Sequence, residues 1–349
     1  MFEREVALYR ALRPGLRAVT LVTYGGAADL AFSDRLSGIG IICNRRGWSE
    51  KWYLRALPLL CRLRRKGEMV FKSNQTIGAD IAVDTARRVG ARFVARCGYP
   101  HAEFAVRMYG EGSPEAKAAL ALERRVFKEA DRGIVATEAM KQSIVAAHGV
   151  APDGLAVVPN YVQMDVFCPN EDLATAWNRI CFIGRVEAQK NVSALLTAVE
   201  GMDVAVDIVG EGSLRQELEG QARKSGVRAV FHGNLPHGEL PAILRRAAVF
   251  VLPSHFEGHP KTLLEAMACG VAVIGADSPG IREVVRHMET GLLCGVSAVE
   301  IRAALETLHQ DDALRRRLGR SARAFAEREV SLDRAVERER AVYSALTAS

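Results

Sequence analysis

Short apolar runs alternate with longer amphipathic stretches along almost the whole chain of 349 residues. Several runs are rich in Val, Ile and Phe without polar alternation, which is typical of parallel strands covered on both faces. The predicted strands occupy residues 19–23, 39–43, 69–72, 92–96, 133–137, 155–159, 179–183, 205–209, 228–232, 249–252 and 271–275. Alternation of such strands with helical stretches predicts an α/β protein built from βαβ units.

A polar stretch at residues 160–178 interrupts this pattern near the middle of the chain. The chain is also longer than one hydrophobic core usually organises. We therefore predict two doubly wound domains, residues 1–165 and 166–325, and a helical tail, residues 326–349, that packs back on the first domain. Open α/β sheets bind ligands at the carboxyl ends of their strands, so a cleft between the domains is the expected site.

Composition narrows the class of protein. Hydrophobic residues make up 49% of the chain and charged residues 25%, which excludes a disordered or fibrous protein. No apolar run approaches the ~20 residues of a membrane span, and the N-terminus mixes charges with apolar residues, unlike a signal peptide. The seven cysteines are scattered, without a CxxC pair, which favours a reducing cytoplasm over a zinc cage or disulfide framework. The net charge of +6 would attract nucleic acid, anionic lipid or phosphorylated ligands.

The segment 253–270 reads PSHFEGHPKTLLEAMACG and follows a predicted strand. Pro260 suits the first turn of a helix, so Glu257 precedes that helix and Glu265 lies more than one turn into it. This spacing separates the two carboxylates by roughly 7 Å or more along the axis. They could hold two parts of one extended ligand, with the free amides of the helix N-terminus favouring phosphate.

Three further segments follow predicted strands. FIGRVEAQKN places Arg185 and Lys190 after the turn at Gly184, where two cations suit a diphosphate. VGEGSL is a Gly-rich turn, and FHGNL could cradle a flat base with backbone groups. Each signal alone is weak, because the cations could pair with Glu187, the glutamates could be solvated, Gly-rich turns are common, and His232 is better explained as structural. Their joint order along the chain is the stronger observation.

With GRVEAQKN, VGEGSL, FHGNL, AAVFVLPS, EGHPKTLLEAMACG, SPGIREVV and TGLLC, the chain resembles the retaining glycosyltransferases of family four. These motifs cover most of residues 179–295, and the first half matches less well. The resemblance implies the GT-B fold, in which two doubly wound Rossmann-like domains face a central cleft, the first for the acceptor and the second for the donor. It also implies transfer from a nucleotide-diphosphate sugar to a saccharide or lipid-linked acceptor without a required metal, in the assembly of envelope polysaccharide or lipopolysaccharide.

The resemblance also implies site residues. Arg185 and Lys190 would bind the donor diphosphate and stabilise the departing nucleotide, Glu265 would bind the ribose diol, and Glu257 would lie near the transferred sugar. The remaining donor contacts implied in this way, from glycine loops, the base region and the helix start, are Gly25, Gly26, Gly184, Gly233, Asn234, Leu235, Gly258, His259, Pro260 and Lys261.

The family's first domain often carries a histidine just after its fourth strand. Here that strand runs into Cys97-Gly98-Tyr99-Pro100-His101, so His101 either takes this catalytic place on a longer loop or is a loop histidine without such a role. Cys97 has no nameable partner base and is better explained as a buried thiol. No DxD-type metal pair stands out, since Asp311-Asp312 lies in the helical pattern that runs from about Ser297 and is better explained as solvated.

Residues 45–66 read RRGWSEKWYLRALPLLCRLRRK. Cations beside aromatic residues suit an anionic membrane surface, where they could present a lipid-linked acceptor to a cytoplasmic, peripherally bound enzyme. The alternative is an ordinary helix that packs Trp52 and its leucines onto the first sheet. Nucleic acid is a poorer interpretation, because no recognised binding fold accompanies the charge.

Two other functions stay open from the sequence: a GT-B-type nucleotide-sugar epimerase and a non-catalytic two-domain sugar-binding protein. A dinucleotide-binding oxidoreductase is disfavoured, because no G-x-G-x-x-G follows the first strand of either half. The donor base, the sugar, the acceptor and the oligomeric state are not fixed by the sequence.

Overall fold

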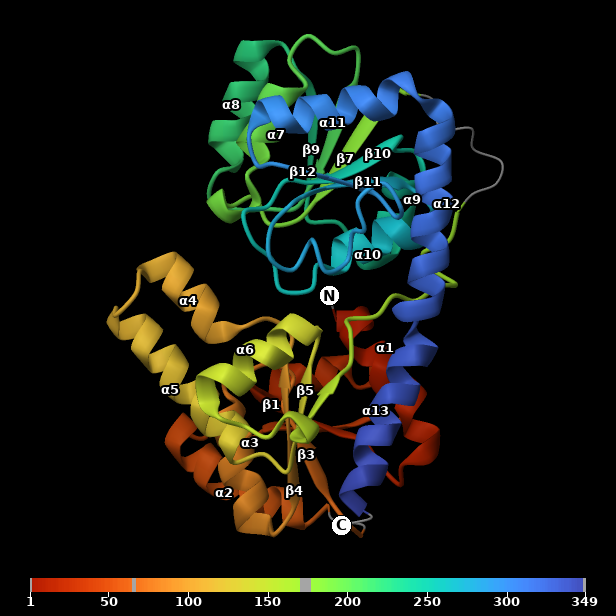
Figure 1. Ribbon diagram of the computed structural model, residues 1–349. Helices are drawn as coiled ribbons and strands as arrows, with labels where there is room; N and C mark the ends of the chain where they lie inside the picture. The colour runs from red at the N-terminus through yellow and green to blue at the C-terminus, as the bar shows by residue number, and fades with distance from the viewer. Residues whose placement is uncertain (1, 65–66, 170–176, 348–349) are drawn as a thin grey trace. The chain divides into compact units, whose positions relative to one another are not determined.

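The computed structural model describes residues 2–64, 67–169 and 177–347 (Figure 1). The chain forms two compact units. We call residues 2–159 together with those from Ala335 onward the N-terminal unit, and Asn160–Arg334 the C-terminal unit.

The division between the units falls after Pro159 and not after residue 165 as the sequence predicted. The reason is local hydrogen bonding: the backbone N–H of Val162 donates to Val330 O at 2.8 Å, and that of Leu332 donates to Val162 O at 3.0 Å. These bonds hold residues 160–165 in the C-terminal unit. They also keep the chain in that unit as far as Arg334, so the tail returns to the N-terminal unit at Ala335 rather than at residue 326.

The C-terminal unit is built on one six-stranded parallel sheet with the order β12-β11-β10-β7-β8-β9. Its strands are β7 Arg179–Ile183, β8 Ala205–Val209, β9 Arg228–Gly233, β10 Val249–Leu252, β11 Ala272–Ala276 and β12 Leu292–Cys294. The first strand, β7, lies centrally, and the chain fills one side of the sheet before crossing to the other. The carboxyl ends of β7 and β10 therefore form the topological switch point, where doubly wound sheets bind ligands.

Helices cover both faces of this sheet, α7, α8 and α11 on one and α9 and α10 on the other (Figure 1). Their bounds are α7 Val192–Ala198, α8 Arg215–Ser225, α9 Leu240–Arg245, α10 Lys261–Ala268, α11 Ala298–Gln310 and α12 Asp312–Glu329. The strands β7, β8, β10 and β11 are buried on both faces, with Phe182 and Phe250 fully inaccessible, which accounts for their unbroken apolar runs.

In the residues that the structure describes, the N-terminal unit holds six parallel strands, which hydrogen bonds join into two sheets, β1-β2 and β3-β4-β5-β6. The strands are β1 Thr20–Gly26, β2 Gly40–Asn44, β3 Val70–Lys72, β4 Arg92–Cys97, β5 Arg132–Val135 and β6 Leu155–Val157. The helices are α1 Phe2–Leu12, α2 Glu50–Arg62, α3 Ala79–Val89, α4 His101–Tyr109, α5 Pro114–Lys128, α6 Glu138–His148 and the part of α13 Leu332–Thr347 that begins at Ala335. All eleven predicted strands are present within a few residues of their expected bounds, and β12 is the strand that the sequence did not predict.

Buried charge holds α13 in the N-terminal unit. Glu339 of α13 is fully buried and forms an ion pair with Lys72, the last residue of β3. The hydroxyl of Tyr343 donates to Glu339 Oε1 at 2.5 Å, and Arg340 Nη2 donates to the carbonyl of Ala11 at 3.1 Å. A charge pair of this burial is costly to break from one side, so the end of the chain is a structural part of the N-terminal unit.

Within residues 2–64, 67–169 and 177–347, no helix combines the length and the apolar character needed to cross a membrane.

Candidate active site

The strongest candidate site lies at the carboxyl ends of β7 and β10 in the C-terminal unit. The loop after β7 carries Lys190 and the loop after β10 carries Glu257, and the ammonium Nζ and the carboxylate Oε1 form an ion pair. The two side chains are only 13% and 9% exposed. Opposite charges are rarely buried to this degree unless they are paired. Two residues predicted separately from two motifs thus meet at the switch point of the sheet.

The two loops are fixed to each other by residues beside Lys190. Gln189 accepts a hydrogen bond from the backbone N–H of His255 at 3.0 Å, and its side-chain Nε2 donates to Phe256 O at 2.7 Å. Asn191 Nδ2 donates to Pro253 O at 3.2 Å and to Val296 O at 2.8 Å. Both residues were missed by sequence reasoning, although they stand in the motif that contains Lys190. They hold the backbone that presents Glu257.

The Gly-rich turn after β8 packs closely against the backbone of the loop after β7. A Cβ atom at Gly210, which has φ +131°, would overlap the carbonyl of Gly184, and one at Gly212 would overlap Val186. The backbone N–H of Val186 donates to Glu211 O at 2.8 Å. VGEGSL is therefore explained first by close packing of backbone on backbone, which only glycine allows.

Arg185 lies on the same loop and is exposed. The carboxylate that the sequence offered as its alternative partner, Glu187, instead accepts hydrogen bonds from Ser213, from Oγ at 2.6 Å and from N–H at 2.9 Å. Those bonds, with a smaller contribution from the Arg185 charge, lower the pKa of Glu187. Lys190 pairs with Glu257 and not with Glu187, so the loop offers one pre-positioned cation and one exposed cation.

Glu265 lies inside α10 and is 1% exposed. His237 Nε2 lies 2.9 Å from its Oε1, and the His237 ring packs against Phe167 with the ring centres 5.0 Å apart. The carboxylate can only accept, so Nε2 is the donor of this bond. His237 is a third residue that the sequence did not single out, because it is adjacent to Glu265 only in the folded unit.

The helix start before Glu265 is also buried. Gly258, His259 and Pro260 are buried, and Lys261, the first residue of α10, is partly buried. Asn160 fixes this segment, since its N–H donates to His259 Nδ1 at 3.2 Å and its Nδ2 donates to His259 O at 2.7 Å. The His259 ring is therefore engaged within the protein.

The predicted base region follows β9. Gly233 ends the strand with φ +67°, and its carbonyl accepts a hydrogen bond from the N–H of Gly210 at 2.8 Å. Asn234 is exposed and Leu235 is partly buried.

Two family models match this chain. Residues 6–161 match the glycosyl transferase 4-like domain, and residues 169–325 match glycosyl transferases group 1. The chain belongs to the group 1 glycosyltransferases.

Similar proteins fit this assignment. Glycogen synthase from Mycobacterium tuberculosis is 31% identical over 213 residues, which are 58% of this chain and 51% of that protein. GDP-mannose-dependent alpha-mannosyltransferase from Mycolicibacterium smegmatis is 33% identical over 252 residues, 68% of this chain and 63% of that protein. The chain thus spans about half the length of the first relative and less than two thirds of the second.

The solved structure of HepE from Anabaena in complex with UDP and glucose has a TM-score of 0.81 with this chain. The match covers 98% of this chain and 95% of that chain at 16% identity. A likeness at this identity establishes the fold, and the two parallel-sheet units are those of a GT-B protein.

In this group 1 family member, the N-terminal unit places the predicted histidine differently from expectation. His101 is the first residue of α4 and not part of a longer loop. The next N–H, that of Ala102, donates to Glu123 Oε2 at 3.2 Å, while Glu123 Oε1 lies 2.9 Å from His148 Nε2. This buried carboxylate satisfies the first turn of α4 and so starts the helix at His101.

Cys97 immediately precedes that turn and is buried. Burial raises the pKa of its thiol to about 12, with a smaller contribution from the Glu123 charge. The thiol donates to the carbonyl of Tyr99. A protonated, buried thiol is not a nucleophile, which supports the structural interpretation of Cys97.

The structure also corrects the expectation that Gly25 and Gly26 form a glycine loop. Gly25 and Gly26 are the last two residues of β1 and not a loop after it, because Gly26 pairs with Asn44 of β2 beyond a register shift. A Cβ at Gly25 would overlap the carboxylate of Asp29, which accepts a hydrogen bond from Thr23. Space for Asp29 is thus a structural reason for glycine at this position.

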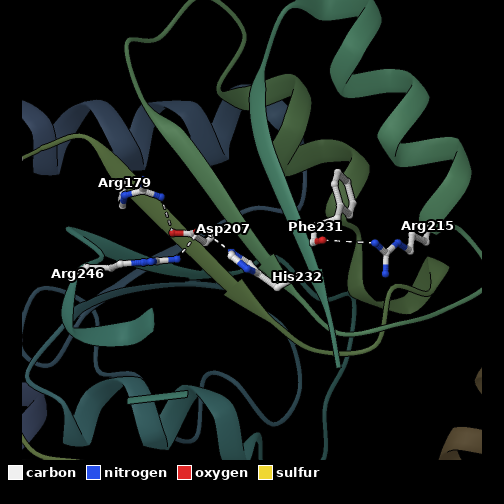
Figure 2. A network of polar contacts seen from close by, with 6 residues as sticks. All are labelled: Arg179, Asp207, Arg215, Phe231, His232 and Arg246. Atoms are coloured by element: carbon white, nitrogen blue, oxygen red, sulfur yellow. Dashed lines mark hydrogen bonds and ion pairs between the residues drawn. The ribbon is translucent and has the colours of Figure 1, made fainter. Parts of the chain in front are cut away.

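The C-terminal unit also contains a network of charged side chains around Asp207 of β8 (Figure 2). Asp207 is fully buried, and three side chains converge on it: His232 Nε2 at 2.7 Å, and Arg179 Nη1 and Arg246 Nη2 each at 3.0 Å. Burial opposes ionisation, but the bond to His232 and the two guanidinium charges outweigh it and lower the pKa of Asp207. The contact supports a structural role for His232.

Within the part of the chain that the structure describes, no three His, Cys, Asp or Glu side chains gather in a way that could hold a metal ion. Asp311 caps α12 by accepting from Leu314 N–H at 2.8 Å, and Asp312 pairs with Arg315 and Arg316. The Asp-Asp pair of the sequence is thus a helix start.

Proposed function

We propose that this protein transfers a sugar from a nucleotide-diphosphate sugar to a saccharide or lipid-linked acceptor, with retention of configuration at the transferred carbon. The observation that carries the proposal is the buried Lys190–Glu257 pair at the switch point, beside the exposed Arg185. A diphosphate there would meet one fixed and one movable cation, and a sugar beyond it would meet a carboxylate. Membership of the group 1 family supports this use of the site.

The chemistry follows from charge. The bond between the sugar carbon and the diphosphate oxygen breaks as negative charge grows on that oxygen, leaving an oxocarbenium-like sugar. Lys190 and Arg185 would neutralise the growing charge, together with the positive end of the α10 helix dipole. An acceptor hydroxyl then bonds to the same face of the sugar carbon, and its proton passes to the departing diphosphate. In this proposal the cations provide the stabilisation without a metal ion.

The other donor contacts are proposed from their places in the unit. Glu265, oriented by His237, would bind the ribose hydroxyls, and the backbone of Asn234 and Leu235 would hold the base. We propose uracil or guanine as the base, since one relative is named for GDP-mannose and one fold neighbour contains UDP. The roles of His101, Gly25 and Gly26 stay predictions.

We further propose a cytoplasmic protein that works at the inner face of the membrane in the assembly of envelope polysaccharide or lipopolysaccharide. The support is the cationic surface of α2, described in the next subsection. An intracellular donor and a lipid-linked acceptor would meet at such a surface.

The test is product analysis by mass spectrometry with UDP-, GDP-, ADP- and CMP-sugars, saccharide and lipid-linked acceptors, and EDTA in half of the reactions. The proposal predicts a glycosylated acceptor from donors of one base, in equal yield with EDTA. A new nucleotide-sugar formed without an acceptor would instead indicate an epimerase, and binding of donors without any product would indicate a sugar-binding protein. Lys190→Ala should lower product formation roughly 100-fold or more, while Lys224→Ala, a change of an exposed lysine of α8, should not lower it.

A further inference from the structure

Helix α2 of the N-terminal unit has two apolar faces. One packs into the unit: Tyr53, Leu57 and Cys61 follow each other at four-residue intervals and are almost fully buried. The other consists of Trp52, Leu59 and Leu63, which are 63%, 61% and 75% exposed. Leu63 follows the last helical residue and keeps helical backbone angles. The intervals of seven and four residues place these three side chains on one stripe.

The structure corrects the simpler expectation for this helix. That expectation had Trp52 and the leucines packing onto the sheet, whereas Tyr53 and Leu57 make that contact and Trp52 points away from it. Three large apolar side chains in one exposed stripe are unusual on a soluble surface and indicate an interaction site.

Cations surround the stripe. Six exposed basic residues lie between residues 45 and 64, with Glu50 as the single acidic residue in that range. They are Arg45, Arg46, Lys51, Arg55, Arg62 and Arg64. Arg65 and Lys66 of the same predicted segment lie outside the described residues.

Two of these cations lie over aromatic rings. The Arg55 guanidinium is 5.4 Å from the centre of the Trp52 ring, and that of Arg46 is 5.4 Å from the centre of the Trp48 ring. A tryptophan that carries a cation over its ring suits the boundary between lipid headgroups and acyl chains. Leu59 and Leu63 supply the deeper apolar contact, and the other arginines supply charge at headgroup level.

We propose that this face of α2, comprising Trp52, Leu59, Leu63 and the six cations, docks on a membrane surface rich in anionic lipid. Charge and apolar character decide among the possible partners. A second copy of the same face would bring twelve like charges together, and nucleic acid would leave Leu59 and Leu63 exposed to water. An anionic bilayer satisfies both properties at once. The inference goes beyond sugar transfer and holds whatever donor the other unit binds.

The test is co-flotation of the purified chain with phosphatidylcholine vesicles, with and without phosphatidylglycerol. We expect flotation with the anionic vesicles alone, weakened by high salt, and a blue shift of tryptophan emission. The variant Trp52→Ser/Leu59→Ser/Leu63→Ser should lose roughly tenfold or more in vesicle affinity, and so should Arg45→Ser/Arg46→Ser/Arg55→Ser. A matched control, Val299→Ser, removes a side chain that is 78% exposed on α11 and should float like the wild type.

Circular dichroism melting of each variant shows whether it is folded, since none of these side chains is buried. Donor binding, measured in the same preparations, separates this inference from the proposed function because it should be unchanged. Absence of wild-type flotation, or equal flotation of the apolar variant, would overturn the proposal. So would a dimer in light scattering that the apolar variant dissociates, because the stripe would then be an interface between copies.

Discussion

The carboxyl edges of the two central strands, β7 in the C-terminal unit and β4 in the N-terminal unit, are organised by different means. At β7, loops are held by backbone contacts that require glycine and by side chains bonded to neighbouring carbonyls, and they present a charge pair, Lys190 and Glu257. At β4, a buried carboxylate, Glu123, holds the helix start at His101 beside an inert thiol. The first edge is built to present charge, whereas the second is built to start a helix.

This difference teaches where sequence motifs are informative. A loop that depends on close backbone approach needs glycine at fixed positions, so it leaves a pattern in the sequence. A helix start that depends on a buried carboxylate from a distant helix leaves none. Five predictions test the contrast, from the largest expected effect to the smallest.

Lys190→Ala should have the largest effect. It removes the fixed cation and leaves the Glu257 carboxylate, only 9% exposed, without its partner. Turnover of the sugar nucleotide should fall roughly 100-fold or more, the usual cost of removing one preorganised charge from such a site. Steady-state kinetics against Lys224→Ala give the comparison, and equal turnover in the two variants would remove Lys190 from the site.

Gly210→Ala should destabilise the C-terminal unit, because the new Cβ would overlap the carbonyl of Gly184 at a positive φ. We expect a loss of about 3 kcal/mol or more in the free energy of unfolding. Gly220→Ala is the matched control: it lies in α8 with open space around it and should gain about 0.5–1 kcal/mol. Urea unfolding of both variants measures the difference, and a neutral Gly210→Ala would show that the loops are not in tight contact.

Asp207→Asn tests the charged network of β8. Three partners lose a buried carboxylate, so stability should fall by about 2 kcal/mol at neutral pH, less than for a fully buried pair because the arginines reach water. The control is Asp203→Asn, because Asp203 forms an exposed ion pair with Arg228. Its loss of stability should stay within about 0.5 kcal/mol.

The loss of stability in Asp207→Asn should depend on pH. The pKa of Asp207 is lowered by folding, so its contribution is complete above the unfolded value of roughly 3.9 and is lost as the pH falls through the folded-state pKa. The difference between wild type and Asp207→Asn should therefore shrink below about pH 4. A difference that stays constant down to the acid transition would contradict the assignment.

His237→Ala should weaken nucleotide binding without a comparable change in turnover at saturation, because His237 orients Glu265 and does not itself touch the reacting atoms. We expect roughly a tenfold loss of affinity, the scale of one buried hydrogen bond to a charged group. His237→Asn, which keeps a donor, should recover part of it in titration calorimetry. An unchanged nucleotide affinity in both variants would contradict the proposed binding of the ribose by Glu265.

Cys97→Ala should have the smallest effect. The thiol is protonated at neutral pH, since its pKa is raised to about 12, and it bonds within its own turn. Turnover should stay within about threefold of wild type. A loss comparable to that of Lys190→Ala would show that the β4 edge takes a direct part in the chemistry.

The sequence predicted most of the fold and three charged residues of the candidate site. The unbroken apolar runs located eleven strands, and the motifs located Lys190, Glu257 and Glu265. β12 was missed, although it is no shorter than β3 and β6, which were predicted.

The missed contacts depend on which strands become neighbours. His237 meets Glu265 and Gln189 meets Phe256 across elements that lie far apart in the chain, and no local spacing encodes such a meeting. The end of β1 was misplaced for the same reason, since Gly26 stays in the strand only through its pairing with Asn44. On α2, the helical period shows two apolar stripes but not which of them faces the sheet.

The most direct measurement is titration calorimetry of UDP and GDP into wild type, Lys190→Ala and Lys224→Ala, with EDTA present. We predict that wild type and Lys224→Ala bind one of the two nucleotides with equal affinity, and that Lys190→Ala binds it roughly tenfold or more weakly. Equal affinity in all three proteins, or no binding of either nucleotide, would contradict a donor site at the β7–β10 switch point.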